Sequence, residues 1–174
     1  MGMDSYVYSF NRDDWNRKTA LEKEKQELHR EVDKKYRIVE EKYKWTKVSW
    51  YNIEKDCTEE EREYFESSVR KLNELSDKID EGDSSELMYW RKPFELHRFI
   101  TTNFLPEGED DNCNHIVLSK EAIEKILQEL KTNGMNYSEG CWDGGETEYA
   151  IELFTVILEK TDFETTVITY YSWY

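Results

Sequence analysis

Apolar residues recur every three or four positions between about Asp14 and Tyr43, where most other positions are Glu or Lys. This period predicts a long amphipathic helix with one apolar stripe. The residues of the stripe are Leu21, Leu28, Val32, Tyr36, Val39 and Tyr43. Because such a stripe must be buried, we expect it to pack on a second long helix of the same chain, with dimerisation as the alternative.

Further helices are predicted along the rest of the chain, each marked by capping or terminating residues. A capping box at Thr58–Glu61 precedes a helix through Ile79, Pro93 opens a helix through Phe104, Ser119 caps a helix that ends at Asn133–Gly134, and a glycine-bearing loop, Ser138–Gly145, leads to a last helix over about Glu146–Lys160.

Stretches with the alternation or the β-branched and aromatic composition of strands lie between these helices. They are Met3–Phe10, Thr46–Ile53, Glu86–Trp90 and Thr165–Tyr174. Short strands separated by helices indicate an α+β fold, with a small, mainly antiparallel sheet packed with helices and a long amphipathic helical arm. We expect residues 1–174 to form a single domain in which 14–81 is a helical elaboration.

The net charge and its distribution along the chain argue against some classes of protein. The 174 residues have a net charge of −15, and 25 of them are aromatic, which indicates a folded chain. Residues 1–56 hold 13 Lys and Arg against 12 Asp and Glu, whereas residues 57–174 hold 11 against 27. This excess argues against direct binding of nucleic acid or of an anionic membrane. Widely spaced cysteines at 57, 113 and 141, with no apolar segment of membrane-spanning length, predict a reduced, cytoplasmic protein.

Several motifs carry a family resemblance. They are the opening MGMDSYVY, Tyr89–Lys92 followed by Glu95–His97, the loop Asp110–Cys113, the glycine loop with its acidic helix start, and the terminal Tyr-Tyr-Ser-Trp. In order and spacing they resemble an uncharacterised family of small phage and prophage proteins, over residues 1–10 and about 86–174. The resemblance implies a phage origin and the host cytoplasm as location during infection. It brings no known chemistry, so no catalytic residue is transferred.

A basic and aromatic patch within these motifs is a candidate ligand site. Its residues are Tyr89, Trp90, Arg91, Lys92, His97 and Trp142. The cationic groups suit a phosphate or carboxylate, and an aromatic ring would stack on a flat group such as a nucleotide base. The alternative, which packing statistics favour, is architectural: Tyr89, Trp90 and Phe94 belong to the core, Arg91 pairs with a carboxylate, and His97 forms a hydrogen bond inside the fold.

We expect no metal and no cofactor. Asp110, Asn112, Asn114 and Glu121 match much of an EF-hand loop, but His115 stands where the sharp turn needs glycine. The Cys and His spacings lack the pairs that mark structural zinc. A solvated acidic loop is the favoured interpretation.

No enzyme signature is present, so we expect an interaction protein rather than an enzyme. Together with the phage resemblance, the acidity predicts a protein that inhibits a host defence system by binding a host protein, whose surface would be a basic nucleic-acid-binding one. The candidate partner-binding residues are Glu107, Glu109, Asp110 and Asp111. Two alternatives stay open: the charge only keeps the protein in solution, or the Arg91, Lys92 and His97 patch binds or sequesters a nucleotide-like ligand.

Overall fold

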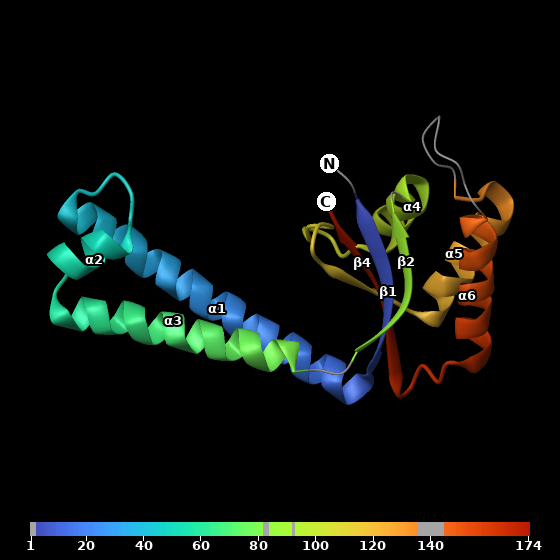
Figure 1. Cartoon of the computed structure of the whole chain (residues 1–174), viewed down its shortest axis with the longest axis horizontal. Helices are drawn as coiled ribbons and strands as arrows, with labels where there is room; N and C mark the ends of the chain where they lie inside the picture. The colour runs from blue at the N-terminus through green and yellow to red at the C-terminus, as the bar shows by residue number, and fades with distance from the viewer. Residues whose placement is uncertain (1–2, 82–83, 92, 136–144) are drawn as a thin grey trace. The chain divides into compact units, whose positions relative to one another are not determined.

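A computed structural model describes residues 3–81, 84–91, 93–135 and 145–174. The chain divides into two compact units, Met1–Asp13 with Asp83–Tyr174, and Asp14–Gly82. Over the described ranges it contains six helices and a four-stranded antiparallel sheet (Figure 1). The predicted α+β class, with its antiparallel sheet and long first helix, is therefore confirmed.

The first unit holds the sheet, whose strands lie in the order β2-β1-β4-β3. The strands are β1 (Asp4–Asn11), β2 (Ser84–Arg91), β3 (His115–Leu118) and β4 (Thr166–Trp173). The first strand is central and pairs with both β2 and β4, so that Tyr6 lies opposite Tyr89 on one side and Tyr171 on the other. The first and the last strand of the chain, β1 and β4, are therefore neighbours in the middle of the sheet.

Helices of the same unit cover one face of this sheet (Figure 1). They are α4 (Phe94–Phe104), α5 (Lys120–Asn133) and α6 (Glu146–Lys160). Because successive strand residues point to opposite faces, Val7 and Trp90 enter the core between sheet and helices, together with Ile123 and Phe154. Tyr6 and Tyr89 point to the other face.

The second unit is a helical hairpin of α1 (Arg12–Tyr43), α2 (Trp50–Asp56) and α3 (Glu59–Asp80). Val32 and Val39 of the α1 stripe are buried in a cluster with Phe65 of α3, on which Tyr36 stacks with 4.5 Å between ring centroids. Lys71 and Glu24 form an ion pair of 2.9 Å between the same two helices. The C-terminal part of the α1 stripe, from Leu28 to Tyr43, thus packs on a long helix of the same chain, as expected, with Val32 and Val39 fully enclosed.

Most predicted elements are confirmed. Thr58 forms the predicted capping box with Glu61 at the start of α3, and Ser119 caps α5 by accepting a hydrogen bond from the Ala122 amide. These caps satisfy backbone amides that lack a partner in the first helical turn, and they act locally, which is why the sequence reveals them. The predicted glycine loop lies outside the described residues except for Gly145, which precedes α6.

The strand predicted over Thr46–Ile53 is wrong. Ser49 caps α2, its side chain accepting a hydrogen bond from the Asn52 amide, and Ile53 is buried within the hairpin. The aromatic and β-branched residues of this stretch are compatible with a strand as well as with a helix. Packing of Ile53 within the hairpin favours the helix. The prediction also missed β3, a strand of four residues that is too short for a visible alternation.

Of the helices in the described ranges, none has the length and apolarity needed to cross a membrane.

Candidate functional site

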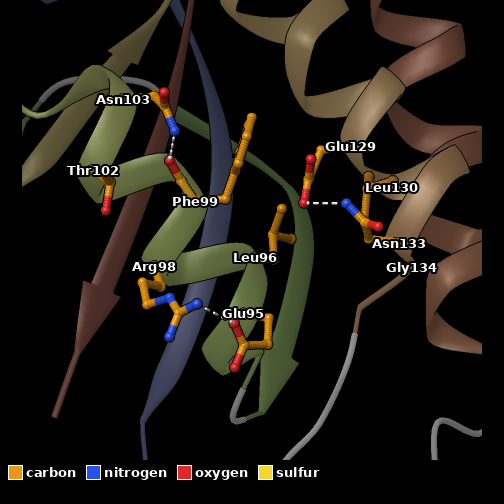
Figure 2. Close-up of a pocket in the computed structure, with 10 residues that line it drawn as sticks. All are labelled: Glu95, Leu96, Arg98, Phe99, Thr102, Asn103, Glu129, Leu130, Asn133 and Gly134. Carbon is orange, nitrogen blue, oxygen red and sulfur yellow. Dashed lines mark hydrogen bonds and ion pairs between the residues drawn. The ribbon is translucent and has the colours of Figure 1, made fainter.

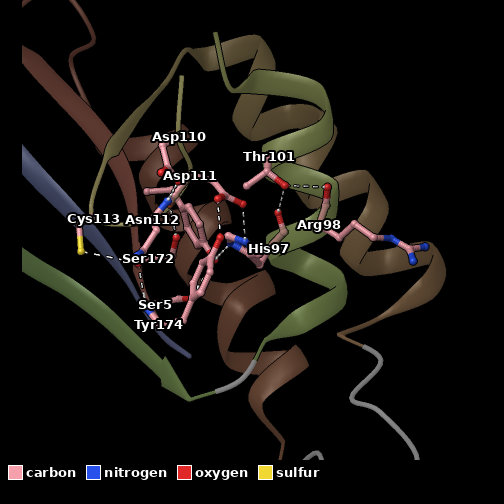
Figure 3. Close-up of polar contacts among 11 residues, drawn as sticks. Ser5, His97, Arg98, Thr101, Asp110, Asp111, Asn112, Cys113, Ser172 and Tyr174 are labelled. Atoms are coloured by element: carbon pink, nitrogen blue, oxygen red, sulfur yellow. Dashed lines mark hydrogen bonds and ion pairs between the residues drawn. The ribbon is translucent and has the colours of Figure 1, made fainter. Parts of the chain in front are cut away.

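A chain of polar side chains runs from the core of the first unit to its surface (Figure 3). In the core, the Tyr170 hydroxyl lies 2.9 Å from Ser5 Oγ and 3.2 Å from His97 Nδ1. On the other side of the imidazole ring, His97 Nε2 lies 3.1 Å from Asp111 Oδ2. Because the Asp111 carboxylate only accepts, Nε2 carries the ring proton of the neutral imidazole, and the Tyr170 hydroxyl donates to Ser5 Oγ.

The environment keeps this histidine neutral. Burial lowers the pKa of His97, and the neighbouring Asp111 opposes that shift only in part. The pKa of Asp111 is also lowered, chiefly because the Tyr174 hydroxyl donates a hydrogen bond to its carboxylate and then because His97 faces it. The same bond raises the pKa of Tyr174 to about 12. A neutral imidazole and an ionised carboxylate are therefore the states at neutral pH.

Backbone and side-chain bonds fasten the loop around Asp111 to the end of β4. Ser172 Oγ donates to the Asp111 carbonyl at 2.7 Å, and the Cys113 amide donates to the Ser172 carbonyl at 2.8 Å. The Tyr174 amide donates to Asn112 Oδ1 at 2.9 Å. Residues 111–113 of the loop between α4 and β3 are consequently bonded to the end of β4.

The outer side of this loop carries most of the predicted partner-binding residues. Glu107, Glu109 and Asp110 are exposed. Asp110 also accepts a hydrogen bond from the Asn112 amide, and Glu109 accepts one from Asn114 Nδ2, each of 2.9 Å. Asp111, the fourth predicted residue, is turned to His97 and Tyr174 instead, so it positions the loop rather than facing a partner.

The predicted ligand patch is not assembled by the described residues. Trp90 is buried at 2% exposure and packs on Phe154 with 6.2 Å between ring centroids, whereas its neighbours Tyr89 and Arg91 are exposed on the opposite face of the sheet. His97 is buried in the polar chain. Lys92 and Trp142 lie outside the described residues.

The architectural interpretation of this patch fits some of its residues only. Trp90 is in the core and His97 is hydrogen-bonded inside the fold, as that interpretation expects. Tyr89 and Phe94, by contrast, are 44% and 38% exposed. Adjacent strand residues cannot share a face, which is why the segment divides between core and surface.

A cavity of about 350 Å³ lies between α4 and α5 (Figure 2). Its polar side chains are paired within their own helices: Arg98 with Glu95 at 3.3 Å, and Asn133 with Glu129 at 2.8 Å. The other lining residues are Leu96, Phe99, Thr102, Asn103, Leu130 and Gly134. No predicted site residue is among these lining residues.

Comparison of the chain with protein-family models, with curated proteins and with solved structures found no match. The resemblance to phage proteins therefore stays a prediction from motifs.

Within the described ranges, no three His, Cys, Asp or Glu side chains lie close enough to hold a metal ion. In the stretch resembling an EF-hand, Asp110 and Asn112 take part in the loop bonds above, and Glu121 lies in the first turn of α5.

Sequence reasoning missed Tyr170, Ser172 and Tyr174 as partners of His97 and Asp111. The available signal was their alternation along the last strand, which places all three on one face. Nothing local indicated that this face would meet α4 and the acidic loop.

Proposed function

We propose that this chain is an interaction protein whose acidic loop, residues 107–111, binds a basic surface of a host protein. The observation that supports it is the combination of exposed carboxylates at Glu107, Glu109 and Asp110 with a backbone that Asp111 fastens to His97 and Tyr174. A loop ordered before binding loses less conformational entropy on association than a mobile one. The attraction between the loop carboxylates and the partner is therefore offset less by the entropy cost of ordering the loop.

The overall charge supports the same kind of partner. Residues 57–174 hold 11 Lys and Arg against 27 Asp and Glu, so the loop lies in a strongly acidic part of the sequence. Complementary charge raises the rate of encounter and selects among partners. A basic nucleic-acid-binding surface is the partner class that fits this charge, and inhibition of a host defence factor is the role that we propose from the phage resemblance. We propose no catalytic reaction for the chain.

Charge-neutralising variants test the loop against the rest of the acidic surface. The site variant combines Glu107→Gln, Glu109→Gln and Asp110→Asn. The control combines Glu124→Gln, Glu152→Gln and Glu159→Gln, which are exposed positions on α5 and α6 and change the net charge by the same amount. A host protein captured on the wild-type chain serves as the probe, and its association rate is measured at low and at high salt.

We expect the site variant to slow association by about tenfold at low salt and to flatten its salt dependence, because screening acts first on such long-range terms. The control should stay within about twofold of wild type, since only the loop is expected to face the partner. Equal effects of the two variants would mean that net charge alone acts and would overturn the proposal for the loop.

A further inference from the structure

Aromatic rings gather on the sheet face that points away from α4, α5 and α6. Tyr6 lies at the centre, with its ring centroid 5.1 Å from that of Tyr89 and 6.1 Å from that of Tyr171. The three residues are register partners on β2, β1 and β4, so the contacts follow from the strand pairing itself. Such cross-strand rings stabilise a sheet, yet Tyr89 is 44% exposed, and Tyr6 and Tyr171 are only partly buried.

The next register position adds a carboxylate and an indole. Asp4 pairs with Trp173 on β4 and with Arg91 on β2, and its Oδ1 accepts a hydrogen bond from the Tyr89 hydroxyl at 3.0 Å. Trp173 is 55% exposed. We name the surface formed by Asp4, Tyr6, Tyr89, Tyr171 and Trp173 the aromatic platform.

The aromatic platform is continuous with the acidic loop. Trp173 and Tyr174 point to opposite faces of the sheet, but Cys113, at the end of the loop, forms a side-chain hydrogen bond with Tyr171 of the platform, and its amide donates to the Ser172 carbonyl. The loop therefore meets the platform at Tyr171. Because the loop carboxylates and Asp4 are anionic, the group favoured above these rings is a cation.

We propose that the aromatic platform receives arginine side chains of the basic partner, a proposal that rests on the proposed function of the loop. A guanidinium is planar, stacks on Tyr and Trp faces, and donates in a fork that a carboxylate such as Asp4 accepts. A lysine ammonium has the same charge but is more strongly hydrated and presents no flat face. The platform therefore supplies a preference for arginine that charge alone does not.

Arg91, at the edge of the platform, provides a second test of the proposal. It is exposed and lies opposite Asp4 in the register, so its positive charge opposes an incoming guanidinium. Arg91→Gln removes that charge and should strengthen binding of an arginine ligand.

The probes are an oligo-arginine and an oligo-lysine peptide of equal length, whose affinities are measured by calorimetry. Wild type should bind the arginine peptide about three- to tenfold more tightly, the range that one or two exposed cation–π contacts provide. Tyr89→Ala and Trp173→Ala should reduce this preference to less than about twofold with little change for the lysine peptide, and Arg91→Gln should increase it. Tyr149→Ala is the matched control, because Tyr149 is 60% exposed on α6, and it should leave the preference unchanged.

The same peptides distinguish the contribution of the platform to binding from that of the loop. The triple loop variant should weaken both peptides alike while the arginine preference persists. Equal affinity of wild type for the two peptides, binding of neither, or a preference that survives Tyr89→Ala and Trp173→Ala overturns the platform. Intact binding of both peptides by the loop variant, with the preference still dependent on Tyr89 and Trp173, overturns the loop and leaves the platform as the binding surface. Thermal unfolding of each variant confirms that it is folded.

Discussion

His97 Nε2 lies 3.1 Å from Asp111 Oδ2, which joins helix α4 to the acidic loop that precedes β3. The histidine is buried, whereas the aspartate sits at the edge of an exposed loop. This pair holds a surface segment against the buried core, and the side chains of both residues are titratable. Stability and loop order should therefore depend on pH and on this contact.

The first prediction concerns acid. Burial lowers the pKa of His97 below its ordinary value of 6.5. Between that value and the lower pKa of the folded state, the unfolded chain binds more protons than the folded one. The free energy of unfolding should therefore fall as the pH falls below about 6.5, by at most about 1.4 kcal/mol per pH unit for this group, and the group adds no slope at higher pH. Urea unfolding between pH 7 and pH 5 measures it.

Two histidine variants isolate this effect from the general loss of negative charge on acidification. His97→Gln should be less stable at pH 7 and should lack the His97 component of the pH dependence. His29→Gln, at an exposed position on α1, should keep the wild-type pH dependence. Identical pH profiles for wild type and His97→Gln would show that this histidine does not titrate as its burial requires.

The second prediction separates the two roles within the acidic loop. Asp111→Asn removes charge-assisted bonds from Tyr174 and His97, and we expect it to lower the free energy of unfolding by about 1–3 kcal/mol. Asp110→Asn, one residue earlier and exposed, should change it by less than about 1 kcal/mol. Hydrogen exchange at the Cys113 amide should accelerate in Asp111→Asn only. Comparable effects of both substitutions would contradict a positioning role for Asp111.

The third prediction concerns the helical hairpin. Phe65 is fully buried between α1 and α3, so Phe65→Ala should destabilise the hairpin by about 3–5 kcal/mol, the usual cost of such a cavity. Ile38→Ala, at 59% exposure on α1, is the control and should cost less than about 0.5 kcal/mol. Thermal or urea unfolding followed by circular dichroism reports both.

Oligomeric state distinguishes the intrachain hairpin from dimerisation through α1. Because Val32 is buried within the hairpin, Leu28→Asp with Val32→Asp should unfold the hairpin of a monomer. A wild-type dimer that these substitutions convert into a folded monomer, measured by light scattering, would show instead that the stripe serves a second copy.

The fourth prediction concerns the nucleotide alternative. Arg91 is exposed, so Arg91→Ala should change the free energy of unfolding by less than about 0.5 kcal/mol. With Trp90 in the core and His97 bonded to Asp111, we expect nucleotides not to raise the melting temperature. A nucleotide that does raise it, with an effect lost in Arg91→Ala, would establish the ligand-binding function in place of the loop function.

Local patterns of the sequence determined the helices and most of the strands. The stripe from Leu21 to Tyr43, the capping box at Thr58 and the cap at Ser119 each depend on residues within one or a few helical turns. Their physical basis is hydrogen bonding and side-chain period, which act over a few residues. The acidic excess after residue 56 is equally visible in the sequence, and our proposal of a basic partner depends on it.

Tertiary structure alone decided which residues share a surface. The pairing of His97 with Asp111 and Tyr170 spans 14 and 73 residues of sequence, and no local preference brings those side chains together. The sheet order sends Trp90 into the core and its neighbour Tyr89 to the aromatic platform, and packing in the hairpin turns the β-like stretch around Trp50 into a helix. In each case burial against distant segments outweighs the weak intrinsic preferences of the residues themselves.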